Sequence, residues 1–247
     1  MRKKGCPEEY PILLSVNGTE IAVFQLTNQD LEDWAYGYLF SEGFISQPEE
    51  VRSIRITEGK IRADLHNDLD VEEKFSGVSR YTPEYGRGAT FLSMTDVKKF
   101  QKVSSKKTYL LSYLLEKQTE LSRNSPMYLE TGGMHAAAIV HPDGTLTVRE
   151  DISRHNAVDK VIGYALRNGL EADERVLLTS GRISYEMLSK AAKLGFPVVC
   201  SRTAATRQAV ELAKFLNIEV VGYLRRNMAV QYTAFGRVIN DLEKNGS

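Results

Sequence analysis

The densest group of chemically capable side chains lies in "REDISRHNAVDK", residues 149–160. An apolar strand pattern ends there and an apolar helix pattern begins, so the polar residues fall at a helix N-terminus. Arg154, His155 and Asn156 occupy the first turn, where unpaired backbone N–H groups favour an anion. Because His155 and Asp159 are four residues apart, we expect the carboxylate to pair with the imidazole on one helix face.

A structural interpretation of the same stretch stays open. Asp151 and Ser153 are ordinary N-cap residues, and a solvated, charged helix start would account for Glu150 and Lys160. It accounts less well for the His–Asn pair in front of an apolar helix body.

Three further stretches place polar groups where strands meet other elements. "TGGMH" puts Gly132, Gly133 and His135 directly before a strand, as a close approach to a ligand or as a tight turn. "TSGR" (179–182) and "SRT" (201–203) follow apolar strands and precede helices, where hydroxyls, amides and arginine suit phosphate. Ordinary capping explains these junctions equally well.

Composition excludes several classes of protein. The 247 residues include 32 basic and 32 acidic side chains, so no bulk attraction to nucleic acid or membrane is indicated. The two cysteines, Cys6 and Cys200, form no CxxC, which argues against a disulfide framework or a cysteine-rich zinc site. No run of ~18 apolar residues occurs, and the start lacks a signal-peptide pattern. We therefore expect a cytoplasmic protein without a membrane span.

The expected elements divide the chain into two parts. Hairpins are predicted around Asn17-Gly18 and Glu58-Gly59, with a helix through Leu31–Leu39 between them. The patternless stretch 79–91, a short helix over 96–102 and a helix over 106–121 follow. After a third hairpin around 141–144, strands and helices alternate to the end, which predicts a parallel βαβαβ unit. We expect a lobe of residues 1–125 and an α/β core of residues 126–247, or one continuous domain.

Several motifs together carry a resemblance to a known family. These are "LEDWAYGYLFSEGFI", "TGGMHAAA", "EDISRHNAVDKVIG", "TSGRISYEMLSKA", "SRTAATRQAVELA" and "GYLRRNMAVQYT". In this order they resemble the formate dehydrogenase accessory sulfurtransferase family, FdhD, over nearly the whole chain.

The resemblance implies an α/β fold like that of cytidine deaminase: a three-layer core with a mixed sheet, plus an N-terminal lobe of hairpins and helices. It implies a dimer without a protein-bound metal that passes sulfur from a cysteine desulfurase to the molybdenum cofactor, bis-molybdopterin guanine dinucleotide. The recipient is the catalytic subunit of formate dehydrogenase. The matching positions expected to contact that cofactor, or GDP, are Thr131, Gly132, Gly133, His135, Asp151, Arg154, His155, Asn156, Asp159, Lys160, Ser180, Gly181, Arg182, Tyr223, Leu224, Arg225, Arg226, Asn227 and Met228.

One departure from the family pattern affects the chemistry. Relatives carry a cysteine between the second hairpin and the next helix, whereas here the equivalent loop is "TPEYGRGATF" with Tyr85 at the expected position. A phenol cannot form a persulfide, because sulfur transfer needs a thiolate. Cys200 is the alternative carrier, although its place at a strand end favours a buried core residue.

Three hypotheses remain open, so the sequence does not decide whether the chain is an enzyme. The first is a sulfurtransferase-like accessory protein. The second is a relative that only binds the nucleotide cofactor, as chaperone or regulator. The third is an enzyme that uses His155 as general base.

Overall fold

The structure is a computed structural model that describes residues 4–66, 100–226 and 228–242. The stretch 79–91 with Tyr85, and Asn227, lie outside the described residues. Of the short helix expected over 96–102, only residues 100–102 are described, and they are not helical.

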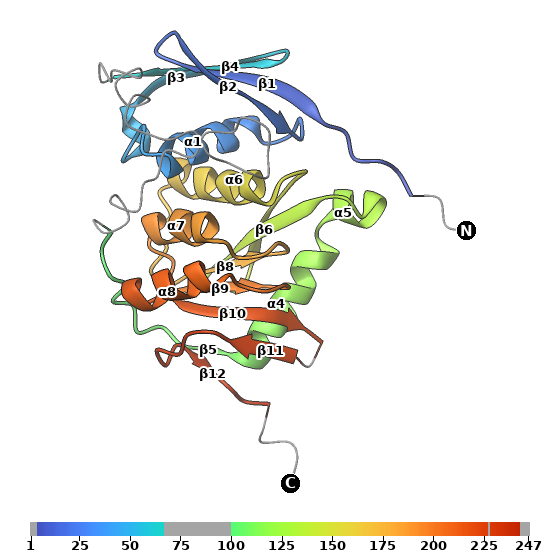
Figure 1. Cartoon of the computed structure of the whole chain (residues 1–247), viewed down its shortest axis with the longest axis vertical. Coiled ribbons are helices and arrows are strands. Elements are labelled where there is room, and N and C mark those ends of the chain that lie inside the picture. The colour runs from blue at the N-terminus through green and yellow to red at the C-terminus, as the bar shows by residue number, and fades with distance from the viewer. Residues whose placement is uncertain (1–3, 67–99, 227, 243–247) are drawn as a thin grey trace.

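The first two predicted hairpins join in one four-stranded sheet at the top of Figure 1. Its strands are β1 (Tyr10–Val16), β2 (Thr19–Leu26), β3 (Val51–Thr57) and β4 (Lys60–Leu65). Asn17, Gly18 and Gly59 have positive φ, as the tight turns require. The order is β2-β1-β4-β3, with β1 parallel to β4, a pairing between hairpins that their local patterns did not predict.

The second half forms a six-stranded mixed sheet, and its βαβαβ unit is confirmed. The order is β11-β10-β9-β8-β6-β7; β8, β9 and β10 are parallel, whereas β6 and β11 run antiparallel to their neighbours. The strands are β6 (His135–Val140), β7 (Leu146–Asp151), β8 (Val176–Thr179), β9 (Val198–Ser201), β10 (Glu219–Arg225) and β11 (Met228–Gln231). The helices are α6 (Arg154–Arg167), α7 (Tyr185–Leu194) and α8 (Arg207–Leu216).

Alternation along the strands gives this sheet two apolar faces, so the expected three-layer core is confirmed. Ala137 and Ile139 belong to the cluster that includes the apolar faces of α6, α7 and α8. Ala136 and Ala138 point the other way, into a cluster with α4 (Leu111–Arg123). Successive strand residues face opposite sides, which lets one sheet carry an apolar layer on each face.

The helix expected over 106–121 begins later and is followed by one that was missed. Tyr109–Leu110 form β5, which pairs in parallel with β12 (Val238–Ile239), so helix starts only at Leu111. "RNSP" ends α4, but Pro126 also begins α5 (Pro126–Thr131), since proline fits the first helical turn.

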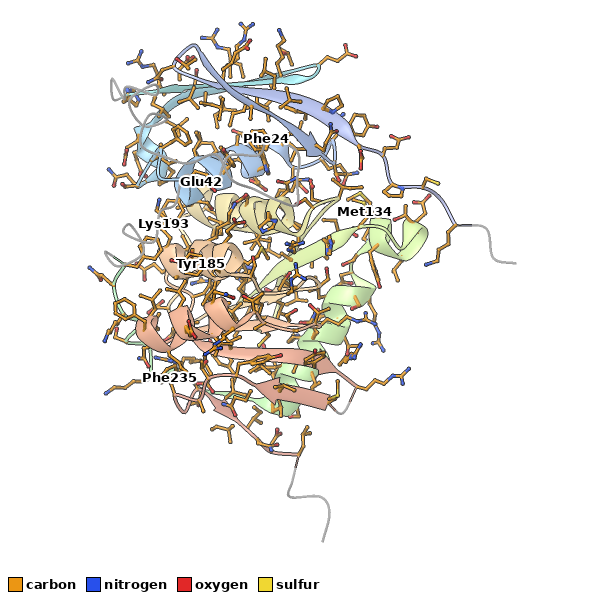
Figure 2. The ribbon with its side chains drawn as sticks, in the orientation of Figure 1. Phe24, Glu42, Met134, Tyr185, Lys193 and Phe235 are labelled. Carbon is orange, nitrogen blue, oxygen red and sulfur yellow. The ribbon has the colours of Figure 1, made fainter. Side chains whose placement is uncertain are left out.

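Helix α1 (Leu31–Ser41) joins the two parts by lying directly on α6. A Cβ on Gly37 would fall 1.8 Å from the Asp159 carbonyl oxygen, and one on Gly163 would fall 1.7 Å from that of Asp33. Only glycine allows this approach. Phe24 packs on Trp34 (ring centroids 4.9 Å apart), and Figure 2 shows it between the four-stranded sheet and α1. One apolar cluster thus contains residues of both the four-stranded and the six-stranded sheet. The expected domain boundary near residue 125 stays a prediction.

Candidate functional site

Four strands end or begin at one edge of the six-stranded sheet. In the ladder, His135 at the start of β6 lies opposite Asp151 at the end of β7. Ala137 pairs with Thr179 at the end of β8, and Thr179 pairs with Ser201 at the end of β9. The carboxyl ends of β7, β8 and β9, followed by helices α6, α7 and α8, therefore meet beside the start of β6. Ligands of open α/β sheets bind at this kind of edge.

A pocket of about 330 Å³ lies at this edge, between the end of α4, α5 and the sheet. Its volume is at the lower end of ordinary ligand pockets. Four predicted site residues line it: Gly132, Gly133, His135 and Ser180. Its other lining residues are Leu121, Ser122, Ser125, Tyr128, Met134, Ala136, Arg202 and Thr203.

Gly181 holds the predicted site residues close together behind this pocket. A Cβ at Gly181 would lie 2.8 Å from Cβ of Arg154 and 3.2 Å from Nδ1 of His135. The Ser180 hydroxyl accepts the Ala136 N–H at 3.0 Å, and its oxygen lies 3.3 Å from His135 Nδ1. The end of β8, the His135 imidazole and the aliphatic part of the Arg154 side chain therefore lie in close contact.

Both histidines of the edge favour the neutral form in the free protein. Burial is the main cause that lowers the pKa of His135, and the charge of Arg154 adds to it. Burial also lowers the pKa of His155, against the neighbouring Glu186 carboxylate, which raises it. A bound anion would counter both effects, because it stabilises the imidazolium.

The expected pairing of His155 with Asp159 is wrong. His155 Nε2 instead lies 3.3 Å from Glu186 Oε2 on α7. Asp159 accepts a hydrogen bond from Ser41 (2.8 Å) and pairs with Lys190 (2.6 Å). The two side chains thus point to different neighbours, and spacing along one helix did not reveal partners on α1 and α7.

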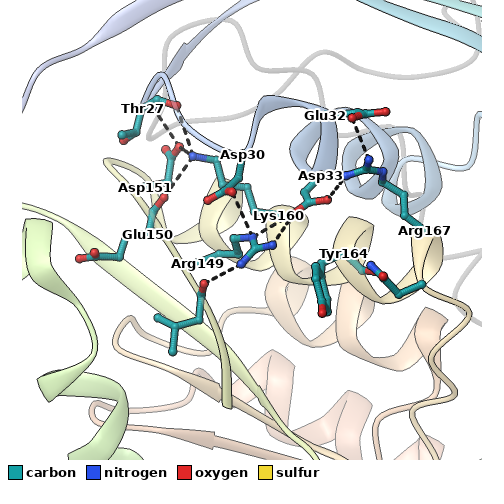
Figure 3. Close-up of polar contacts among 12 residues, drawn as sticks. Thr27, Asp30, Glu32, Asp33, Arg149, Glu150, Asp151, Lys160, Tyr164 and Arg167 are labelled. Carbon is teal, nitrogen blue, oxygen red and sulfur yellow. Dashed lines mark hydrogen bonds and ion pairs between the residues drawn. The ribbon is translucent and has the colours of Figure 1, made fainter. Parts of the chain in front are cut away.

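Asp151 and Lys160 form a buried ion pair that ties β7 and α6 to the N-terminal elements (Figure 3). Lys160 Nζ lies 2.7 Å from Asp151 and also donates to the Glu150 and Thr27 carbonyls. Both side chains are fully buried. Asp151 also accepts hydrogen bonds from Asn156 and from the Thr27 N–H.

Four of the predicted site residues therefore bond to other residues of the fold: Asp151, Asn156, Asp159 and Lys160. Asn156 accepts from the Trp34 indole at 3.2 Å and donates to the Gln25 carbonyl at 2.9 Å. Their expected role as cofactor contacts stays a prediction.

The described residues of the fourth predicted segment, 223–226 and 228, are not among the pocket's lining residues. Leu224 is fully buried in the α4 cluster, so only its backbone could face a ligand. Arg225 and Met228 are exposed, and Arg225 lies over the Tyr223 ring. Arg226 lines a separate hollow of about 460 Å³ along α4. Arg182, in the segment that precedes α7, is exposed and does not line the pocket. Thr131 is the neighbour of the lining residue Gly132 but does not line the pocket itself.

Sequence reasoning left part of the pocket out. Arg202 and Thr203 stood in a junction judged suitable for anions but were not among the expected cofactor contacts. Ser122, Ser125 and Tyr128 were missed, because "RNSP" was interpreted only as a helix break. Pro126 after a capping serine was the available signal for a second helix.

The two cysteines differ in access. Cys200 is fully buried in the α4 cluster, and burial raises the pKa of its thiol far above the ordinary value, which confirms it as a core residue. Cys6 is exposed. It precedes Pro7, whose ring lies against Gly133: a Cβ on that glycine would be 2.9 Å from Pro7 Cγ.

The comparisons with known proteins agree with one another. Residues 7–239 match the model of the FdhD/NarQ family. The chain belongs to this family. "Sulfur carrier protein FdhD" of Shouchella clausii is 35% identical over 237 residues, covering 93% of this chain and 88% of the relative. The protein of that name from Staphylococcus haemolyticus is 36% identical over 219 residues, covering 88% and 83%.

A solved structure supports the fold of this FdhD/NarQ member. The crystal structure described as a formate dehydrogenase accessory protein from Desulfotalea psychrophila superposes with a TM-score of 0.76 at 25% identity. It covers 94% of this chain and 90% of that one. Among the described helices, none is long and apolar enough to cross a membrane.

Proposed function

We propose that this chain binds the bis-molybdopterin guanine dinucleotide form of the molybdenum cofactor at the sheet edge during formate dehydrogenase maturation. The observation that carries the proposal is the pocket of about 330 Å³ in which His135, Ser180 and Arg202 converge beside two glycines. Hydroxyls, an imidazole and a guanidinium in one concave place suit a phosphate-bearing ligand. GDP carries the guanine and diphosphate of that cofactor and serves as the probe.

The residues present fit the diphosphate part of such a ligand. Gly181 leaves no room for a side chain between the strand end and Arg154, so the backbone stays close to the aliphatic part of the Arg154 side chain. Ser153 caps α6 by accepting the His155 N–H at 3.3 Å, and the positive end of this helix lies at the same edge. The pocket holds one end of the cofactor rather than the whole molecule. The metal centre, when bound, supplies the redox chemistry of the dehydrogenase.

Calorimetry with GDP tests this proposal. We expect wild-type protein to bind GDP, and Arg202→Ala to weaken binding about tenfold, or about 1.4 kcal/mol. Arg207→Ala is the matched control, because Arg207 is exposed on α8 and pairs only with Glu211 among the described residues. Absence of GDP binding, or equal weakening by both substitutions, would refute the proposal.

A second candidate function, sulfur carriage, has one observation in its favour. Cys6 is the exposed cysteine, and its neighbour Pro7 touches the glycine wall of the pocket. Sulfur carriage needs an accessible thiolate, which the buried Cys200 does not offer. Without a carrier thiol, the protein acts as a cofactor-binding chaperone or regulator.

Intact mass after incubation with a cysteine desulfurase and cysteine separates the two functions. A gain of about 32 Da, one sulfur atom, that disappears in Cys6→Ser supports carriage through Cys6. No gain supports the binding function alone. A gain that disappears only in Cys200→Ser would contradict the assignment of Cys200 to the core.

A dimer and a direct complex with the formate dehydrogenase catalytic subunit belong to the same proposal. Both follow from the family rather than from contacts of this chain. Light scattering of the purified protein, alone and with that subunit, checks both.

A further inference from the structure

A further hollow lies at the opposite end of α6 from the sheet edge. Its volume is about 820 Å³. Its walls come from α1, from the 3-10 turn η1 (Pro48–Glu50) and from the last turn of α6 with the residues that follow. The lining residues are Glu32, Tyr36, Gln47, Pro48, Glu49, Ala165, Leu166, Arg167, Gly169, Leu170 and Glu171. We call this hollow the α1–α6 groove.

The floor of the groove is apolar. Tyr36, Leu166 and Leu170 are half-buried and pack against the main hydrophobic cluster. Covering such a surface with an aliphatic side chain is favourable, because apolar area is removed from water.

The rim of the groove is acidic. Glu32, Glu49 and Glu171 are exposed, against Arg167 as the one cation among the groove's described lining residues. The Arg167 guanidinium is already engaged: it lies 2.8 Å from Glu32 and 2.5 Å from Asp33 (Figure 3).

The remaining carboxylates leave the groove with a negative potential. Within the described parts of the chain, neither Glu49 nor Glu171 has an ion-pair partner. The pKa of Tyr36 is raised, first by burial and then by the charge of Glu32, while Arg167 opposes this. Besides burial, the negative charges of Glu32 and Glu49 thus act on the Tyr36 hydroxyl.

We propose that the α1–α6 groove binds a peptide segment of a partner protein in which arginine or lysine alternates with aliphatic side chains. Cationic side chains match Glu49 and Glu171, and the aliphatic ones match the floor of Tyr36, Leu166 and Leu170. Nucleic acid and anionic lipid are repelled by this rim. The groove lies away from the sheet edge, so a peptide there leaves the edge pocket open. This inference does not depend on cofactor binding.

Fluorescence anisotropy with labelled hexapeptides tests the proposal on the full chain. We expect a peptide of alternating Arg and Leu to bind more tightly than one of alternating Arg and Gly, because only the first covers the floor. The double substitution Glu49→Gln/Glu171→Gln should weaken binding of the Arg-Leu peptide about tenfold. Glu20→Gln/Glu58→Gln, which removes the same charge from exposed positions on β2 and in the β3–β4 turn, should leave it unchanged.

A charge exchange provides the second readout. Glu49→Lys/Glu171→Lys should lose the Arg-Leu peptide and gain a peptide of alternating Glu and Leu. Failure of the wild type to bind the Arg-Leu peptide would overturn the proposal. Equal weakening by the groove pair and the control pair would also overturn it, since binding would then follow net charge alone.

Discussion

The buried pairs around α6 and the pocket at the sheet edge both use polar side chains of the family motifs, yet in opposite ways. Around α6, Lys160 and Asp159 are buried and paired with Asp151 and Lys190. At the edge, His135 and Arg202 line an open pocket. Removing one partner of a buried pair leaves an uncompensated charge, so the fold depends on both partners of the first set, whereas the second set can still bind a ligand. We therefore expect motif residues that look alike in sequence to divide into scaffold and site.

The largest expected effect tests the scaffold half of this comparison. Lys160→Met removes the cation beside Asp151 and leaves a buried carboxylate without its counter-charge. We expect a loss of about 3–5 kcal/mol in the free energy of unfolding, measured by urea denaturation. Lys160→Met/Asp151→Asn should recover part of the loss. If Lys160→Met kept its stability and lost only GDP binding, Lys160 would belong to the site.

A somewhat smaller loss is expected from the helix contact. Alanine for glycine inside a helix ordinarily stabilises by up to about 1 kcal/mol. Gly163→Ala should instead destabilise by roughly 2–3 kcal/mol, because the Cβ meets the Asp33 carbonyl. Thermal unfolding of Gly163→Ala gives the sign directly, and a stabilised variant would contradict the close approach of α1 and α6.

For residues that line the edge pocket, we expect substitutions to weaken GDP binding without a comparable loss in the free energy of unfolding. Tyr128 lines the pocket, and an aromatic face there suits a stacked base, worth about 1–3 kcal/mol. Tyr128→Leu should weaken GDP binding about tenfold, whereas Tyr128→Phe keeps the ring and should bind like wild type. Equal losses in both variants would show that the hydroxyl, not stacking, matters.

The smallest effect is a pH dependence of GDP binding. The pKa values of His135 and His155 are lowered in the free protein, and a bound diphosphate would raise them. Binding should therefore take up protons and become a few-fold tighter as the pH falls through roughly 6.5. His135→Gln/His155→Gln should show a flatter profile in calorimetry at pH 6 and pH 8. Since GDP's own protonation affects both proteins alike, identical profiles would exclude the histidines.

Local patterns predicted those parts of the fold that depend on neighbours in sequence. Asn17-Gly18 and the alternating strands around it gave the first hairpin, and apolar strands between helices gave the parallel unit. The parallel pairing of β1 with β4 was not predictable, because it joins two hairpins that are each locally complete.

The candidate site divides in the same way. Glycines and hydroxyls at strand ends were recognisable, and the sheet brings Gly132, Gly133, His135 and Ser180 together. Lys160 could not be assigned from sequence, since its partners include Thr27, more than 130 residues away. The pocket residues at the end of α4 and in α5 were missed for a local reason. The proline of "RNSP" was interpreted only as the end of one helix, although Pro126 also begins the next.

A crystal structure of the protein with GDP tests the central claim most directly. The account predicts a GDP phosphate or base within hydrogen-bond distance of Ser180 or Arg202, with Asp151 and Lys160 still paired. GDP bound elsewhere, or bound at the Asp151–Lys160 pair after the two side chains separate, would contradict the division into scaffold and site.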